Sequence, residues 1–222
     1  MNNFSPVTMY NNLGFIFQFQ GDWGKALEYQ EKALSIREKM EDKFRIPFSY
    51  TNLGKIYFLK EDYSAAREYY QKGTEIAEER KIAEILPELY YDSGELFLQL
   101  KDFERALTQA KKALECASRE GDKIQIGCAY RLLGMICREE RKWPEAQKWL
   151  KESIAVFERL KVPYELGQSC LEIGHLERDR GNIQLSQDYF KRAKEIFEKL
   201  GAKKDLEEAN KELKQEAPSQ SV

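Results

Sequence analysis

The sequence predicts an all-α fold built from five repeated pairs of antiparallel helices. Three series of residues support this prediction, and each series recurs with a period of 40 residues. The first series is glycine, the second is a polar residue followed by a bulky one, and the third is a small residue twelve positions after the glycine. The glycines are Gly14, Gly54, Gly94, Gly134 and Gly174. Self-similarity at a fixed period is the signature of a repeat architecture, in which each unit packs against its neighbours.

Each 40-residue unit contains two stretches with helical periodicity. In the second unit, Tyr50, Leu53 and Tyr57 recur at three- and four-residue spacing, and Ala66 and Tyr70 do the same further along. This spacing places apolar side chains on one face of an α-helix. Each unit is therefore predicted to be a helix hairpin.

The second helix of each hairpin is predicted to begin at the polar-bulky pair. The five pairs are Asp22-Trp23, Asp62-Tyr63, Asp102-Phe103, Lys142-Trp143 and Asn182-Ile183. Asp or Asn can accept hydrogen bonds from the free amides of a helix start. Pro144 fits a first helical turn, where no amide hydrogen is needed.

The glycine in each first helix requires a physical reason, because a glycine inside a helix costs about 1 kcal/mol relative to alanine. The small residues twelve positions later are Ala26, Ala66, Ala106, Ala146 and Ser186. We expect the two helices to approach closely there, so that each glycine faces its small residue across the hairpin.

This pattern resembles the tetratricopeptide repeat, with a glycine in the first helix, an aromatic residue three positions on, and two small residues seven positions apart in the second helix. The later small residues are Ala33, Gly73, Ala113, Ser153 and Ala193. The resemblance covers residues 6 to about 200 and implies a right-handed α-solenoid of five antiparallel helix pairs. The usual family period is about 34 residues. The 40-residue period indicates longer helices, as in the long-repeat members found in polarity adaptors, bacterial peptide-sensing regulators and arrays attached to signalling ATPases.

The expected organisation is a single array over residues 1–216 followed by a disordered tail over 217–222. The repeats are expected at approximately 6–41, 46–81, 86–121, 126–161 and 166–200. A thin apolar stripe of Leu206, Ala209 and Leu213 among Lys and Glu predicts a capping helix over 203–215. The first helix is expected to begin near Pro6.

The first helix is unusually apolar for the end of an array. Phe15, Ile16, Phe17 and Phe19 place apolar groups on nearly every side of it, whereas a terminal repeat normally has a polar outer face. Two interpretations remain open. Either the first repeat contacts an upstream domain or another copy of the chain, or these rings line the groove and the repeat core.

Composition excludes several classes of protein. The chain carries 36 Lys and Arg against 38 Asp and Glu, whereas a general nucleic-acid binder needs a marked basic excess. No apolar run of 18 residues and no leader pattern is present, so we expect neither secretion nor a membrane partner. The spacing of the four cysteines matches neither a metal framework nor a dense disulfide scaffold, and we expect buried thiols in a reducing cytoplasm. They are Cys116, Cys128, Cys137 and Cys170.

The residues needed for catalysis are scarce. His175 is the only histidine, and no glycine-rich phosphate loop accompanies it. We therefore expect no enzyme activity, no cofactor and no metal. A zinc site from Cys128, Cys137, Cys170 and His175 is disfavoured, because Cys170 stands where the family places a packing residue. His175 is interpreted either as a solvated side chain or as a groove residue that contacts a ligand or responds to pH.

The resemblance implies that the first helix of each pair lines a concave groove. The positions that face inward in the family are here Asn11, Phe15 and Gln18; Thr51, Lys55 and Phe58; Tyr91, Glu95 and Leu98; Arg131, Met135 and Arg138; Leu171, His175 and Arg178. The early repeats thus offer aromatic and apolar groups, and the later ones offer arginines. Adjoining Glu88, Glu139 and Asp179 bring the net charge near zero, so the sign of the groove stays open.

The resulting hypothesis is a protein-interaction scaffold whose groove binds an extended or helical peptide. Apolar ligand side chains would meet the aromatic residues, and a carboxylate or phosphate would meet the arginines. Alternatively, the arginines only pair with Glu139 or Asp179. A second functional reading is a peptide-sensing regulatory module of a larger multidomain signalling protein. An RNA-binding array would need a basic groove along every repeat, which Glu88 and Glu95 argue against.

Overall fold

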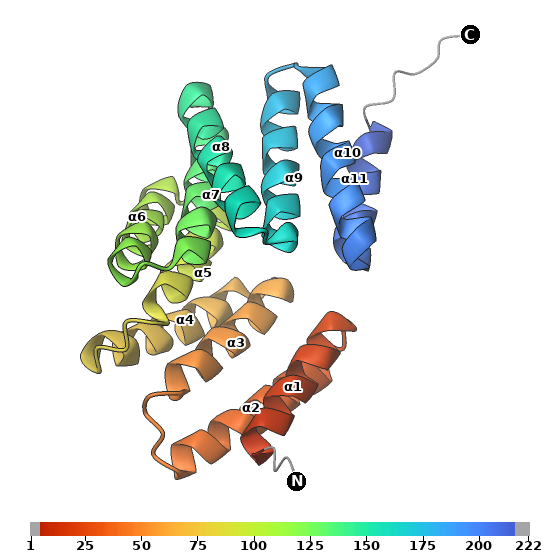
Figure 1. Cartoon of the computed structure of the whole chain (residues 1–222). Helices are drawn as coiled ribbons and strands as arrows, with labels where there is room; N and C mark the ends of the chain where they lie inside the picture. The colour runs from red at the N-terminus through yellow and green to blue at the C-terminus, as the bar shows by residue number, and fades with distance from the viewer. Residues whose placement is uncertain (1–4, 216–222) are drawn as a thin grey trace. The chain divides into compact units, whose positions relative to one another are not determined.

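The computed structural model describes residues 5–215, and within that range it contains eleven α-helices and no strand (Figure 1). The helices are α1 Pro6–Phe19, α2 Trp23–Lys39, α3 Ile46–Leu59, α4 Tyr63–Glu79, α5 Leu86–Gln99, α6 Phe103–Glu120, α7 Lys123–Glu139, α8 Trp143–Leu160, α9 Pro163–Asp179, α10 Ile183–Leu200 and α11 Lys203–Gln215. The predicted all-α class and its succession of helix pairs are confirmed. The tail expected to be disordered, residues 217–222, lies outside the described residues.

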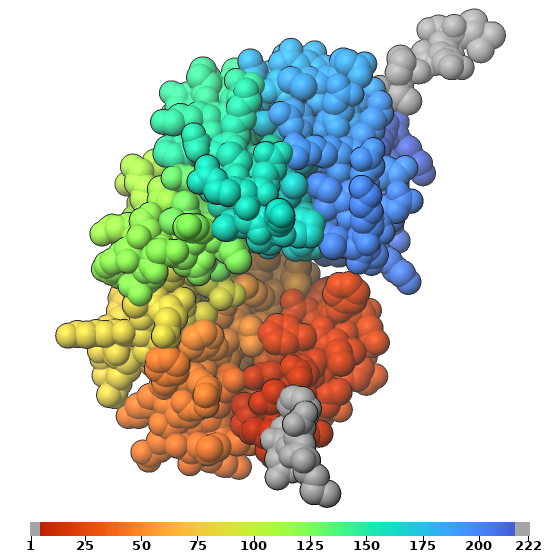
Figure 2. All heavy atoms as spheres, in the orientation of Figure 1, coloured from red at the N-terminus to blue at the C-terminus, as the bar shows by residue number. Residues whose placement is uncertain are grey.

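The chain forms two compact units, residues 1–116 and 117–222, and the boundary falls within α6. In the first unit, α1 packs against α2, α3 against α4, and the first helices α3 and α5 also touch. In the second unit, α7 packs against α8, α9 against α10, and α10 against α11, while the first helices α7 and α9 touch. Figure 2 shows that side chains fill the spaces that separate the ribbons of α9 and α10 in Figure 1. Each unit therefore brings the first helices of successive repeats side by side.

The turns between helices recur every 20 residues, half the period of the sequence. A residue with left-handed backbone follows every helix from α1 to α10: Gly21, Glu41, Glu61, Lys81, Lys101, Gly121, Arg141, Lys161, Gly181 and Gly201. This conformation lets the next amides bond back to the last carbonyls of the helix. In the second pair, for example, the amide of Asp62 donates to the carbonyl of Tyr57 at 3.0 Å. A helix and its turn together thus take 20 residues, although the helices α1 to α10 themselves range from 14 to 18 residues.

The polar-bulky pairs start the second helices, as predicted. The Oδ1 atoms of Asp22, Asp62 and Asp102 accept hydrogen bonds from the amides three residues on at 3.0–3.1 Å. Lys142 and Asn182 make no such side-chain cap. The side chain of Asn182 instead donates to Oε2 of buried Glu177 at 2.6 Å. Asn182 thus stands at the start of α10 and also hydrogen-bonds a carboxylate of the preceding helix α9.

The repeated glycines permit close packing of the two helices in a pair. The small residue twelve positions later is not the only side chain that packs against the glycine. In the fifth pair, Ser186 does face Gly174, because its hydroxyl donates to the glycine carbonyl at 2.8 Å. The space beside the glycine Cα is filled by the residue 16 positions further on. These neighbours are Gln30 for Gly14, Tyr70 for Gly54, Leu150 for Gly134 and Phe190 for Gly174. The glycine therefore makes room for a large side chain, which corrects the expected glycine-to-small-residue contact.

Replacing Gly174 by alanine tests this packing. A Cβ atom there would lie 2.5 Å from Cε1 of Phe190, a separation that requires Phe190 or the helix to move. Overpacking of this kind costs about 1–3 kcal/mol and exceeds the helix-propensity gain of at most about 1 kcal/mol. We expect Gly174→Ala to lower the free energy of unfolding measured in urea, and Phe190→Leu to recover part of the loss in the double variant.

Gly24→Ala is the matched control, because Gly24 is exposed in α2 and its added Cβ would have its nearest neighbour at 3.7 Å. This variant should be as stable as the wild type or up to about 1 kcal/mol more stable. Equal effects of the two substitutions would contradict the packing role assigned to Gly174.

Candidate binding surfaces on the first helices

The residues expected to face a groove all lie on first helices, namely α1, α3 and α5 in the first unit and α7 and α9 in the second. Phe15 is exposed. The half-buried members are Asn11, Gln18, Lys55, Phe58, Tyr91, Glu95, Met135, Arg138, His175 and Arg178. The buried members are Thr51, Leu98, Arg131 and Leu171. Side chains of α3 and α5 meet in one unit, and side chains of α7 and α9 meet in the other.

Thr51 and Leu171 have little surface to offer a ligand. Thr51 is 1% exposed and its hydroxyl donates to the carbonyl of Pro47 within the same helix, while Leu171 is 2% exposed in the core. Both residues lie one turn or less from half-buried neighbours, and a shift of one position on a helix moves a side chain by about 100°. We leave both out of the surface proposed below.

An acidic cluster joins α3 and α5 in the first unit. Lys55 Nζ lies 2.5 Å from Glu88 Oε1 and 3.5 Å from Asp92 Oδ2. Tyr91 donates its hydroxyl hydrogen to Glu95 Oε1 at 2.7 Å. One lysine thus faces three carboxylates, so this part of the first-helix surface has an excess of negative charge.

The pKa values in this cluster follow from burial and charge. Asp92 is 5% exposed, and burial raises the pKa of its carboxyl well above the usual range, although Lys55 opposes the shift. Burial disfavours the charged form of Lys55, but the carboxylates of Asp92 and Glu88 outweigh it and raise the pKa of the amine. Lys55 therefore stays charged and holds the two helices together.

Several oxygen atoms on these first helices are buried without a hydrogen-bond donor. Within the described residues, neither Asn11 Oδ1 nor Gln18 Oε1 on α1 has a donor. Asp92 Oδ2 on α5 has no hydrogen bond and only the Lys55 ammonium at 3.5 Å. An acceptor left without a donor costs about 1–3 kcal/mol. All three oxygens are closed off from the surface, so a ligand reaches them only if neighbouring side chains move.

In the second unit, the arginines form a ladder of ion pairs between successive first helices. Arg131 NH1 lies 2.7 Å from Glu165 Oε2, and Arg138 NH1 lies 3.0 Å from Glu172 Oε2. Arg178 pairs in the same way with Glu212 of α11. Each glutamate stands 34 residues after its arginine. The arginines thus connect one repeat to the next. The recurring 34-residue separation of arginine and glutamate is visible in the sequence and could have indicated this role.

Arg138 has further carboxylates around it. Glu139 Oε1 lies 2.9 Å from its NH2 group, and Asp179 Oδ2 lies 3.7 Å from its Nε. The alternative of pairing with Glu139 or Asp179 is therefore realised, and Glu172 is an additional partner that the sequence reasoning missed. A ligand carboxylate at this arginine would compete with three resident acids.

His175 is not a solvated histidine. Its side chain is 14% exposed, its ring meets the ring of Phe190 edge to face at a centroid distance of 5.1 Å, and Arg178 NH2 lies 2.9 Å from its Nδ1. Because the guanidinium has only hydrogens to donate, Nδ1 acts as an acceptor and the ring is neutral in this contact. Burial lowers the pKa of His175 below its usual value, while Glu172 opposes the shift.

The apolar residues of α1 are largely uncovered. Phe19 is 82% exposed, Met9 53%, Ile16 51% and Phe15 47%. Phe17 is the exception, because its ring stacks on Tyr29 of α2 with a centroid distance of 5.4 Å. Association of the first repeat with another copy or with an upstream domain stays a prediction.

In the range 5–215, no three side chains of the metal-binding types converge, and no helix combines the length and apolar character needed to cross a membrane. The four cysteines are buried as thiols, as expected.

Comparison with family models settles the classification. The model described as "Tetratricopeptide repeat" matches residues 6–79 and 86–159, which is more than half of the chain. The chain belongs to the tetratricopeptide repeat family. These two matches cover the helix pairs α1–α2, α3–α4, α5–α6 and α7–α8. No curated protein sequence matches the chain.

Solved structures share the fold of this tetratricopeptide repeat protein at low identity. BtubC from P. vanneervenii is 22% identical with a TM-score of 0.70, over 88% of this chain and 82% of that one. A Rap protein complexed with competence and sporulation factor is 16% identical with a TM-score of 0.82, over 93% of this chain and 59% of that one. A signal-transduction ATPase with a tetratricopeptide repeat sensor from Pyrococcus horikoshii is 18% identical with a TM-score of 0.71, over 93% of this chain and 32% of that one. The chain spans well under two thirds of the last two proteins.

Charge reversal at Arg138 tests the ion-pair ladder of the tetratricopeptide repeats. Arg138 is 17% exposed, and Arg138→Glu would place a fourth acid among Glu139, Glu172 and Asp179. Breaking a partly buried pair in this way costs about 3–5 kcal/mol. We expect that loss in urea unfolding, and partial recovery when Glu172→Arg is added.

The control for this series is Arg159→Glu, because Arg159 is exposed in the same unit and takes part in no ion pair among the described residues. Its effect should stay within about 0.5 kcal/mol. A loss at Arg138→Glu no larger than that of the control would show that the ladder does not hold the repeats together.

The lowered pKa of His175 predicts a stability change with pH. The unfolded chain takes up a proton near the usual pKa of 6.5, whereas the folded chain does so only at lower pH. The stability is therefore fully present above about pH 6.5 and decreases as the pH falls through the folded-state pKa. Because the chain has one histidine, His175→Gln should remove this component from urea unfolding curves recorded between about pH 8 and pH 5.5. An unchanged pH profile in the variant would contradict the assignment.

Proposed function

We propose that this protein is a non-catalytic interaction scaffold whose first helices bind an extended or helical segment of a partner protein. The observation that carries the proposal is the excess of carboxylates on α5, where Glu88, Asp92 and Glu95 surround the single Lys55 of α3. A lysine or arginine of the partner would pair with the half-buried Glu88 and Glu95. The negative excess beside Lys55 favours a basic segment there.

Apolar contacts would complete this part of the site. Phe15 is exposed and Phe58 and Tyr91 are half-buried, so each ring has surface left for a ligand. Aromatic residues bury a large area at low cost in conformational freedom, which is why they dominate binding energy at interfaces. A basic segment with apolar side chains is therefore the expected ligand of the first unit.

The second unit would contact the partner through Met135, Arg138, His175 and Arg178. Arg138 keeps one donor, Nε, that makes no hydrogen bond within the described part of the chain. A carboxylate or phosphate of the ligand would be accepted there only by competing with Glu139, Glu172 and Asp179. We therefore assign this unit the smaller share of the binding energy.

The alternative function is a peptide-sensing regulatory module. Two structures of similar fold favour it: one is a Rap protein in complex with a factor, and the other is a signalling ATPase whose repeats are called a sensor. The chain spans 59% and 32% of these proteins. In this reading the repeats act as one array in the cytoplasm and control an attached effector, and they need no cofactor of their own.

Charge reversal on α5 tests the proposed binding surface. We expect Glu95→Lys to weaken at least tenfold the affinity for a partner captured by the wild type, which corresponds to about 1.4 kcal/mol. Partners would be captured on the immobilised chain and identified by mass spectrometry, and the bound segment would then be titrated as a synthetic peptide. The control Glu104→Lys makes the same charge change at an exposed site on α6. Equal affinity in both variants would exclude the first-helix surface.

A further inference from the structure

The first helix pair contains a stack of three aromatic rings. Tyr29 of α2 lies between Tyr10 and Phe17 of α1, with ring centroids 6.0 and 5.4 Å apart. A lysine covers each outer ring: Lys32 Nζ lies 6.0 Å from the centroid of Tyr10, and Lys25 Nζ lies 5.0 Å from that of Phe17. Rings seven residues apart on one helix are two turns apart, which leaves room for one ring between them.

The second helix pair repeats this stack. Tyr69 lies between Tyr50 and Tyr57, with centroid distances of 5.9 and 5.3 Å. The middle position of the stack is aromatic in four of the five repeats, as Tyr29, Tyr69, Trp149 and Tyr189. In the first two repeats this ring lies between two rings of the first helix. In the fourth repeat Trp149 meets Tyr130 alone, because the second outer position is Cys137, and in the fifth the outer positions are Cys170 and Glu177.

The third helix pair keeps the outer rings and their cations but lacks the middle ring. Lys112 Nζ lies 5.0 Å from the centroid of Tyr90, and the Arg105 guanidinium carbon lies 4.5 Å from that of Phe97. The middle position is held by Gln109. The third repeat therefore has an aromatic stack from which one ring is missing.

One further substitution enlarges the space around the missing ring. Ser93, which lines the pocket described below, stands where the other repeats have Leu13, Leu53, Leu133 and Ile173. The side chains of Ser93 and Gln109 are half-buried and make no hydrogen bond within the described residues. Two departures from the repeat pattern thus occur at one place.

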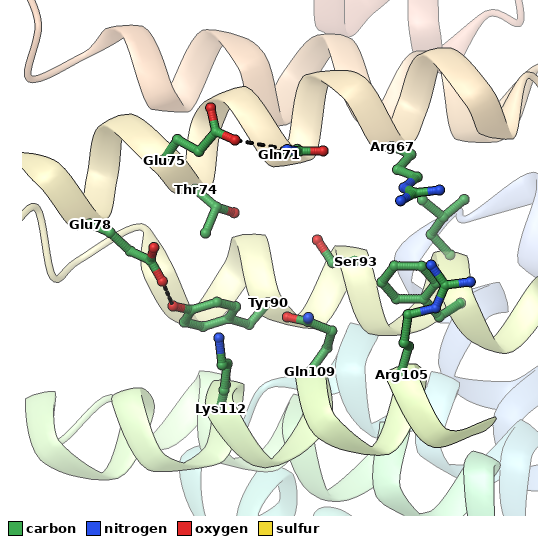
Figure 3. A pocket seen from close by; sticks show the side chains of 12 residues that line it. Arg67, Gln71, Thr74, Glu75, Glu78, Tyr90, Ser93, Arg105, Gln109 and Lys112 are labelled. Carbon is green, nitrogen blue, oxygen red and sulfur yellow. Dashed lines mark hydrogen bonds between the residues drawn. The ribbon is translucent and has the colours of Figure 1, made fainter. Parts of the chain in front are cut away.

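A pocket of about 320 Å³ lies at this place, between α4, α5 and α6 and wholly within the first unit. We call it the third-repeat slot, lined by Tyr90, Ser93, Phe97 and Gln109 among others. Figure 3 shows Ser93 and Gln109 near its centre. Its volume is at the lower end of the range of ligand pockets, about 300–1,000 Å³.

The two ends of the slot differ in charge. Figure 3 shows Arg67 and Arg105 at one end, and Glu75 and Glu78 at the other beside Tyr90. Glu78 accepts the hydroxyl hydrogen of Tyr90. At the opposite end, Arg67 is exposed and has no carboxylate partner among the described residues. An acidic group of a ligand would therefore be drawn towards Arg67.

We propose that the third-repeat slot binds an aromatic side chain of a partner peptide, which takes the place of the missing ring between Tyr90 and Phe97. A carboxylate next to the aromatic residue in the partner would pair with Arg67, and with Arg105 in competition with Asp102, whose Oδ2 already accepts from Arg105 Nε at 2.6 Å. The long side chains of Lys112 and Arg105 now cover the two rings, and both residues are exposed and can rotate away or flank the incoming ring.

This site is separate from the surface proposed above. Tyr90, Ser93 and Phe97 lie within about 60° of one another around α5, whereas Tyr91 and Glu95 point about 100° or more away, at 100° per residue. The slot is also lined by second helices α4 and α6, which the first-helix surface does not include. Loss of one site therefore need not affect the other.

The test uses the full chain and the peptide acetyl-Gly-Asp-Phe-Asp-Gly-amide, titrated while the backbone amide resonances are followed by NMR. Saturable shifts at Ser93 and Gln109 are expected. Gln109→Tyr restores the ring present in the other repeats, so it should weaken binding at least tenfold and raise the unfolding temperature. Gln109→Ala leaves the slot open and should bind as tightly as the wild type within a factor of about three.

Matched peptides separate the two parts of the proposal. Replacing Phe by Leu in the peptide should weaken binding at least fivefold, and replacing both Asp by Lys should do the same through loss of the arginine contacts. Glu95→Lys should leave this titration unchanged, which keeps the result independent of the first-helix surface. The proposal is overturned if the wild type shows no saturable shift up to millimolar peptide, or if Gln109→Tyr binds as the wild type does.

Discussion

The close approach of two helices at one glycine in each pair is the contact on which the rest of this structure depends. At Gly54, Gly134 and Gly174 a large side chain of the second helix occupies the space that a Cβ atom would need. This contact fixes how far apart the two helices lie and which face of each is buried. The uniform turns, with a left-handed residue every 20 positions, then keep each pair in register with the next. A constant scaffold leaves the exposed positions free to differ.

The charged residues of the first helices divide between structure and recognition. In the second unit Arg131, Arg138 and Arg178 are each held by a glutamate 34 residues on, so these three cations mainly join repeats. In the first unit, Lys55 does the same for α3 and α5, but Glu88, Asp92 and Glu95 together outnumber it. A ligand cation is favoured where carboxylates are in excess, whereas the arginines of the second unit already have partners. This difference places the proposed ligand mainly on the first unit.

The third repeat shows how a repeat protein can acquire a pocket without changing its fold. Gln109 and Ser93 each replace a larger side chain of the other repeats, while Tyr90 and Phe97 also line the pocket. The backbone of α5 and α6 follows the common pattern, because the helix starts and turns are unaffected. The space is therefore created by side chains alone.

The sequence by itself determined the all-α class, the helix pairs and the starts of the second helices, because periodicity and capping at Asp22, Asp62 and Asp102 are local properties. Through the family resemblance, the sequence also indicated which candidate groove residues lie on the first helix of each pair. Only the tertiary structure decided which residue fills the space beside the repeated glycines and that the missing ring at Gln109 leaves a pocket. It also decided that Arg131 and Arg138 of α7 are engaged by glutamates of α9, and Arg178 of α9 by a glutamate of α11. These contacts join residues on different helices, and their partners are set by the offset and rotation of one helix against the next, which no single helix encodes.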